Sequence, residues 1–169
     1  MKTKKILLIP LSLLLVGFFF GTVFMASNEP SGTIVEERFE VENAPFFDIF
    51  FNNFKMCLMF VVGCGALSSV MALVQGFSFG TLFGVWITMG NSAADFSLLF
   101  LPHVIFEVAA ILLACMIGFS ILSRLMFSEK EPLSHFIKLQ IPKLCAACLC
   151  VLAGAVVESF LTPAIYNLI

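Results

Sequence analysis

The chain has 169 residues, of which 60% are hydrophobic and only 12% are charged, and its formal net charge is −2. Soluble globular domains average about 45–50% apolar and about 25% charged residues, so this sequence has too little polar surface to cover a soluble particle. The composition therefore excludes a soluble enzyme and a disordered tail. It also excludes a nucleic-acid-binding protein, which needs a basic face.

Five apolar stretches are long enough to cross a bilayer core about 30 Å thick as helices. Lipid offers no hydrogen-bond partner to the backbone, so such segments form helices. We therefore expect an all-α bundle of five transmembrane helices, organised as one integral membrane domain over residues 1–169. The predicted spans cover residues 6–25, 54–75, 77–96, 103–126 and 142–164.

The first predicted span begins like a signal peptide, because Lys2, Lys4 and Lys5 precede an apolar segment. That segment is longer than a usual signal-peptide core, however, and Phe24 stands where cleavage after Ala26 would need a small residue. We expect this span to be retained as an anchor.

The distribution of basic residues predicts the orientation, because cytoplasmic loops of membrane proteins are rich in lysine and arginine. It places the N-terminus in the cytoplasm, residues 27–50 in an outer loop, residues 127–141 in a cytoplasmic loop and the C-terminus outside. Within the outer loop, residues 46–51 are expected to form an interfacial helix. The basic residues on the predicted cytoplasmic side are Lys2, Lys4, Lys5, Arg124, Lys130, Lys138 and Lys143.

Glycines recur every fourth residue at Gly76, Gly80 and Gly84, so they lie on one face of a helix. Small residues let membrane helices approach closely. This face predicts helix packing, and a mobile seam or a dimer interface is the functional alternative. Two further expectations concern the neighbouring segment: a very short connection at Gln75–Gly76 between antiparallel spans, and a facing helix lined by Gly63 and Gly65.

Polar side chains inside apolar segments are costly and usually face the protein interior. His103 and Glu107 are four residues apart and share a helix face, as do Glu158 and Thr162. The predicted topology places both pairs in the outer half of the membrane, near the start of the second span. We therefore predict one polar cluster beneath the outer surface, formed by Asn52, Asn53, His103, Glu107, Glu158 and Thr162.

This cluster allows three interpretations. It is a structural hydrogen-bonding group that sets helix register, a binding or gating site for a peptide, lipid or ion, or a metal or catalytic site. The His-Glu-x-x-His signature of zinc proteases is missing, and Cys145-x-x-Cys148 has no second cysteine pair at zinc-site spacing. We therefore expect no metal, no cofactor and no enzymatic activity.

Several blocks of the sequence resemble the stage II sporulation protein M family in their order and separation. The resemblance covers roughly residues 40–165, and its most specific parts are a Pro-His-x-x-x-Glu pattern and a Glu-x-Phe-x-Thr-Pro pattern. Two positions depart from the family pattern, with Val104 and Gln75 standing where glycine and asparagine are usual. The matching blocks are Phe50 to Asn53, the glycine-rich second and third spans, Leu101 to Glu107, and Ala155 to Pro163.

The resemblance implies a multi-spanning protein of a prokaryotic cytoplasmic membrane. The founding member assists membrane migration during spore engulfment, together with cell-wall-degrading partners. Other relatives accompany circular-bacteriocin clusters as membrane partners of an ATPase. The resemblance thus implies a non-enzymatic scaffold or complex subunit with membrane or cell-wall protein partners. The alternative is a permease-like subunit that works with a separate cytoplasmic ATPase in export of, or self-protection from, such a peptide. A homo-oligomer is compatible with both.

Overall fold

The computed structural model describes residues 3–28, 45–127 and 132–166. These residues form helices joined by short turns and contain no strand, which confirms the all-α prediction within the described part of the chain. The helices are α1 (Thr3–Ser27), α2 (Phe46–Val62), α3 (Ala66–Thr88), α4 (Ala93–Phe127), α5 (Leu133–Val156), the π-helical segment η1 (Val157–Leu161) and α6 (Thr162–Tyr166).

In the part of the chain that the structure describes, four helical segments are long and apolar enough to cross a membrane, namely residues 8–27, 66–88, 93–127 and 133–166. The prediction of five transmembrane helices is corrected at the second and third predicted spans. The segment 54–75 is not one helix, because the chain turns at residues 63–65 and the next helix begins at Ala66. With 17 residues, α2 is about 25 Å long, which is shorter than a typical bilayer core.

The turn at residues 63–65 depends on two left-handed backbone conformations, with φ of 46° at Cys64 and 78° at Gly65. Ser68 is fully buried beneath it, where its hydroxyl donates to the Phe60 carbonyl (2.5 Å) and accepts from the Gly65 N–H (3.2 Å). The predicted connection at Gln75–Gly76 is wrong, since both residues lie inside α3. Gly76 is tolerated in the middle of this helix because it allows close packing against a neighbouring helix.

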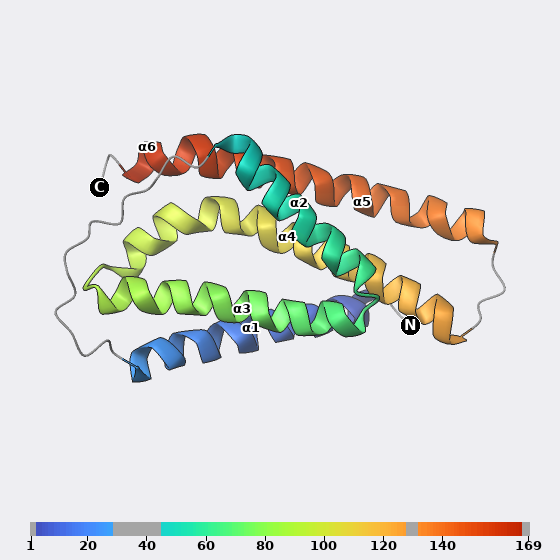
Figure 1. Ribbon diagram of the computed structural model, residues 1–169, viewed down its shortest axis with the longest axis horizontal. Helices are drawn as coiled ribbons and strands as arrows, with labels where there is room; N and C mark the ends of the chain where they lie inside the picture. Colours follow the sequence, from blue (N-terminus) through green and yellow to red (C-terminus); the bar gives the residue numbers. More distant parts are fainter. Residues whose placement is uncertain (1–2, 29–44, 128–131, 167–169) are drawn as a thin grey trace.

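That packing is against α1, with which α3 forms a close pair of parallel helices (Figure 1). A Cβ atom added to Gly76 would meet the Leu14 carbonyl, and one added to Gly80 would meet the Phe18 carbonyl. Gly17 of α1 approaches the Leu73 carbonyl in the same way. The helix that faces the glycines of α3 is thus α1, and Gly63 and Gly65 do not belong to it. Because the glycine face is covered within the chain, it is not available as a dimer interface.

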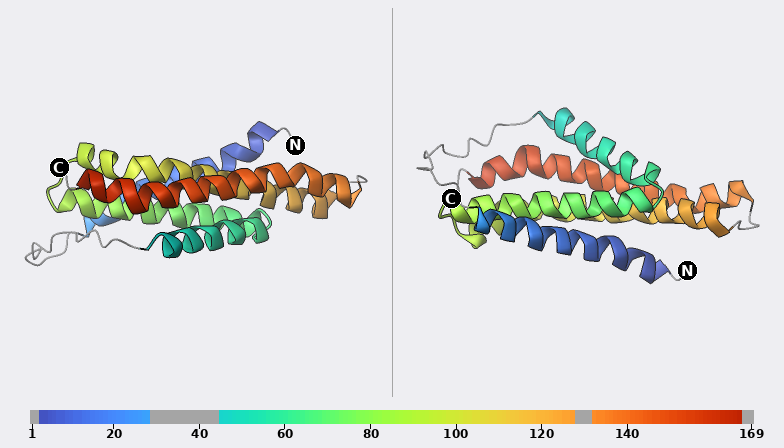
Figure 2. Two further views of the ribbon diagram at one scale, coloured as in Figure 1. Left: turned by 90° about the horizontal axis from the view of Figure 1, so that it is seen from above. Right: turned by 60° about the horizontal axis from the view of Figure 1, so that its bottom comes forward.

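Parallel packing of α1 and α3 requires the segment between them to return to the starting end of the bundle. Figures 1 and 2 show α2 making this return obliquely, across α4 and α5. Its first turns carry a ladder of stacked phenylalanines, in which the Phe50 and Phe54 rings are 5.9 Å apart. The helix predicted at residues 46–51 is thus the beginning of α2, whereas most of the predicted outer loop lies outside the described residues.

The turn between α3 and α4 has clear local causes. Gly90 has φ of 82°, and the Trp86 indole donates to the Ser92 carbonyl (2.8 Å). The Ser92 hydroxyl then caps α4 by accepting from the Asp95 N–H (3.0 Å). Pro102 lies inside α4, where it removes one backbone hydrogen bond, and Figure 1 shows that the first part of this helix bends.

The predicted cytoplasmic loop 127–141 is shorter than expected, because α4 continues to Phe127 and α5 begins at Leu133. Residues 128–131 lie outside the described part of the chain. Near these helix ends, the Arg124 guanidinium lies 5.0 Å from the centre of the Phe136 ring. This cation–π contact joins the end of α4 to the start of α5.

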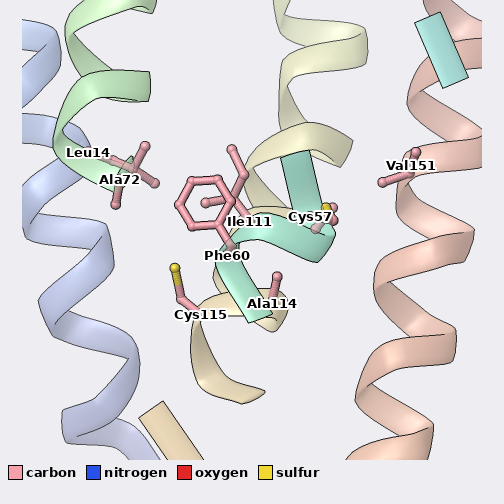
Figure 3. Packing of buried hydrophobic residues seen from close by; sticks show 9 residues of the cluster. Leu14, Cys57, Phe60, Ala72, Ile111, Ala114, Cys115 and Val151 are labelled. Carbon is pink, nitrogen blue, oxygen red and sulfur yellow. The ribbon is translucent and has the colours of Figure 1, made fainter. Parts of the chain in front are cut away.

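The buried core lies where α2 crosses the other helices. Figure 3 shows Phe60 of α2 among side chains from α1, α3 and α4, and its side chain has no exposed surface. Nearby, Gly118 lets α4 approach α2, since an added Cβ would lie 2.8 Å from the Phe60 carbonyl. Small residues thus permit close approach at this crossing as well.

Candidate functional site

The central feature of the candidate site is one face of α4. His103 and Glu107 are one turn apart on this face, and both are directed into the bundle: His103 is buried and Glu107 is half-buried. The Phe100 ring is 5.7 Å from the imidazole. Gly154 of α5 lies opposite, where an added Cβ would be 3.8 Å from the Glu107 Cγ atom. A glycine at this point gives the glutamate space between the two helices.

Glu107 is joined to α2 by a direct hydrogen bond. The Asn53 side-chain amide donates to its Oε1 atom over 2.7 Å. Asn53 is half-buried, whereas the adjacent Asn52 is exposed, because neighbouring residues on a helix point about 100° apart. The predicted asparagine pair therefore divides, and only Asn53 belongs to the polar cluster.

His103 contacts the C-terminal end of the bundle. The Thr162 hydroxyl lies 3.5 Å from the imidazole Nδ1 and also 3.4 Å from the Val157 carbonyl. Thr162 follows the π-helical segment η1, where the chain is wound more widely than in an α-helix. Pro163 explains this widening, because in an α-helix its ring would clash with the Ser159 carbonyl.

Glu158 lies on η1 and is half-buried. Together with His103 and Glu107 it lines a cavity of about 450 Å³ between α1, α3, α4 and η1. Glu107 and Glu158 thus reach the same cavity from different helices. The structure therefore brings together Asn53, His103, Glu107, Glu158 and Thr162, which come from α2, α4, η1 and α6.

Gln75 is a member of this region that the sequence analysis missed. It is half-buried on α3 and lines a small cavity of about 20 Å³ together with Asn53 and Glu107. An amide inside an otherwise apolar segment is the signal that could have identified it. Because a turn was expected at Gln75, its amide was assigned to a connection and not to the interior of a helix.

The groups at this site can form hydrogen bonds and interact through their charges. Within the described part of the chain, no group of three or more His, Cys, Asp or Glu side chains is arranged to hold a metal ion. The six cysteines are free thiols. Two carboxylates, an imidazole, an amide and a hydroxyl next to an apolar cavity are suited to fixing helix positions or to binding a polar group of a ligand.

The chain matches the model of a known protein family. A family model described as stage II sporulation protein M matches residues 10–163, which include most of α1 as well as the polar cluster. No curated protein and no solved structure matches the chain. The matched segment covers most of the chain. It includes nearly all of the four helical segments that, among the described residues, are long and apolar enough to span a membrane. The chain is therefore a membrane protein that belongs to the stage II sporulation protein M family.

Proposed function

We propose that this protein is a non-enzymatic scaffold, a subunit of a membrane complex that holds a membrane or cell-wall protein partner. The observation that carries the proposal is the pair of polar contacts Asn53–Glu107 and His103–Thr162, which join α2, α4 and α6. Hydrogen bonds between membrane helices set their register and spacing. A fixed arrangement of helices is what a scaffold needs to present one surface to its partner.

The proposed orientation has the N-terminus in the cytoplasm of a prokaryotic cell and the C-terminus outside. Arg124 lies near the end of α4, Lys138 lies in the second turn of α5, and Lys143 lies about three turns into α5. Figure 1 shows these two helix ends at the same end of the bundle as the N-terminus, with α6 at the other end. The positive-inside rule assigns the end with these basic residues to the cytoplasm.

The scaffold proposal is tested by crosslinking the protein in its native membrane, purifying it in mild detergent and identifying the attached proteins. We expect a specific membrane or cell-wall protein with the unaltered chain. The double variant Asn53→Ala, Glu107→Ala should lose most of it, while Asn52→Ala retains it. Recovery of the chain alone from crosslinked membranes would contradict the proposal.

A permease-like subunit that works with a separate ATPase is the second candidate, and the cavity beside the two glutamates favours it. In this case Glu107 and Glu158 would line the route of an exported peptide. The double variant Glu107→Gln, Glu158→Gln should then abolish export of, or tolerance to, a peptide such as a circular bacteriocin. Unchanged tolerance in a correctly folded double variant would eliminate this role.

A further inference from the structure

The cavity of about 450 Å³ has walls of two different kinds. Most of its lining is aliphatic or aromatic and comes from α1, α3 and α4, including Leu15, Phe18 and Phe83. The polar part of the lining includes Glu107, Glu158 and His103. This volume lies within the range of about 300–1,000 Å³ that is typical of small-molecule sites. An apolar cavity with a few convergent polar groups has the general form of a binding site.

We propose that this cavity binds a long-chain amine, an amphiphile whose alkyl chain lies against α1 and α3 and whose ammonium group lies between Glu107 and Glu158. The inference goes beyond the proposed function, because it gives the polar cluster a role besides setting helix register. It names the chemical class of ligand, which neither the scaffold nor the permease proposal specifies.

Charge selects the head group of this ligand. Among the described residues that line the cavity there is no lysine or arginine, whereas two glutamates from different elements face it. Two carboxylates that share a poorly hydrated site repel each other. An ammonium group between them would replace that repulsion by charge-assisted hydrogen bonds. A phosphate or carboxylate head group would instead place negative charge beside two carboxyl groups.

The apolar lining of the cavity determines that the rest of the ligand is an alkyl chain. Leu15 and Phe18 belong to the lining of the cavity, yet Leu15 is 62% and Phe18 is 36% exposed. They therefore form an apolar rim on the outer side of α1, a helix that is long and apolar enough to span the membrane. A ligand dissolved in the bilayer can pass over such a rim from the side, with its chain remaining in apolar surroundings throughout.

The protein carries its own reporter for this site. Trp86 is its single tryptophan, and the centre of its ring lies 6.2 Å from that of Phe96 and 6.1 Å from that of Phe100. Both phenylalanines line the cavity. A bromine on the alkyl chain of a bound amphiphile should therefore quench the fluorescence of Trp86.

The experiment titrates the purified full-length protein in detergent with bromine-tagged dodecylamine and, separately, with equally tagged dodecanol and dodecanoate. At neutral pH the amine is protonated. We expect the amine to quench Trp86 at concentrations about tenfold lower than the alcohol, and the carboxylate to quench least. Comparing probes with the same chain removes differences in their partition into detergent.

The double variant Glu107→Gln, Glu158→Gln should reduce the preference for amine over alcohol to about one, because an amide keeps the shape of the side chain but removes its charge. Glu158→Gln alone, which leaves the Asn53–Glu107 hydrogen bond intact, should lose part of the preference. The matched control is Asp48→Asn, an exposed carboxylate outside the cavity, and it should retain the full preference. Val104→Phe, which fills the cavity, should weaken quenching by all three probes.

Three results would overturn the inference: equal quenching by amine and alcohol in the unaltered protein, stronger quenching by the carboxylate, or an amine preference that survives in the folded double variant. None of them affects the scaffold proposal, which is decided by crosslinking to a partner. Conversely, amine binding without any crosslinked partner would leave this inference in place and remove the scaffold.

Discussion

Glu107 is a carboxylate on a helix that is apolar enough to cross a membrane. Placing such a group at the centre of a membrane helix costs about 2.5–3.5 kcal/mol on insertion scales. The structure offsets part of this cost with the amide of Asn53, which donates to Oε1 over 2.7 Å. The same contact connects α2, the shortest of the long helices, to the middle of the bundle.

The strength of this contact can be measured with a double-mutant cycle of Asn53→Ala and Glu107→Ala. Side-chain hydrogen bonds between membrane helices contribute on average about 0.6 kcal/mol, with a maximum of about 1.7. We expect a coupling energy in this range, because either single variant already removes the bond. The measurement is the free energy of unfolding in mixed micelles of detergent and denaturant. Asn52→Ala in place of Asn53→Ala should show no coupling, and additive effects at positions 53 and 107 would contradict the structure.

Ser68 is the second polar side chain whose role is decided by its contacts. It connects the end of α2 to the start of α3 through the Phe60 carbonyl and the Gly65 N–H, and it is fully buried. Ser68→Ala should lower the free energy of unfolding by about 1–2 kcal/mol, because the Gly65 donor loses its partner. Ser78→Ala, where an exposed hydroxyl bonds only within its own helix, should change stability by less than about 0.5 kcal/mol. Equal effects of the two substitutions would refute this account.

Among the helices, α1 and α3 form the closest pair. Their contact depends on glycines from both partners, since Gly17 and Gly21 on α1 interleave with Gly76, Gly80 and Gly84 on α3. The Thr22 hydroxyl also reaches the Gly80 carbonyl over 3.2 Å. Close contact of backbones provides the packing that replaces the hydrophobic effect between helices in lipid.

Replacing glycine by alanine separates packing from helix propensity. Alanine favours a helix by about 1 kcal/mol relative to glycine. Replacing a helical glycine that has free space around it should therefore raise the stability of the protein. At Gly80 the new Cβ would meet the Phe18 carbonyl, and Gly80→Ala should lower the melting temperature. At Gly154 the nearest atom is 3.5 Å from the added Cβ, so Gly154→Ala should leave the melting temperature unchanged or raise it. A harmless Gly80→Ala would show that α1 and α3 are farther apart than described.

For the whole molecule, the parallel arrangement of α1 and α3 decides the path of the chain. Two parallel helices in sequence need a return between them, and α2 makes it (Figure 2). In consequence, the turn after α3 and the start of α5 lie at opposite ends of the bundle (Figure 1). These two positions are suited to a test of orientation.

Single cysteines at Asn91 and Leu133, introduced into a chain whose native cysteines are replaced by alanine, test that orientation. Both positions are exposed. In intact cells a membrane-impermeant maleimide should label Asn91→Cys, whereas Leu133→Cys should react only after permeabilisation. The opposite pattern would invert the proposed topology. Labelling of both sites in intact cells would contradict their placement at opposite ends.

Periodicity and composition sufficed for the features that depend on local sequence. The apolar segments predicted helices near residues 6–25, 103–126 and 142–164, and α1, α4 and α5 cover most of these positions. The spacing of four residues also grouped His103 with Glu107 correctly, because helix geometry alone places such side chains on one face. The glycine spacing in α3 predicted a packing face for the same reason.

Other features required contacts between distant segments. The apolar run from residue 54 to 88 contains several glycines at which a helix could end, and the two hydrogen bonds of Ser68 show that the turn falls at Cys64 and Gly65. The role of Gly17 and Gly21 depends on α3 lying beside them, so the sequence of α1 alone does not reveal it. Similarly, adjacent asparagines are equivalent in sequence, and the packing of α2 on α4 decided that Asn53 alone meets Glu107.

The sequence by itself therefore determined that the chain lies in lipid and that it is helical. An apolar chain whose backbone finds no hydrogen-bond partner in lipid must form helices. The tertiary structure decided which helices are neighbours, where the second turn falls and which polar groups meet beside the cavity. Those outcomes depend on close packing between segments more than 50 residues apart, such as Asn53 and Glu107, and side-chain spacing along one helix carries no information about its neighbour.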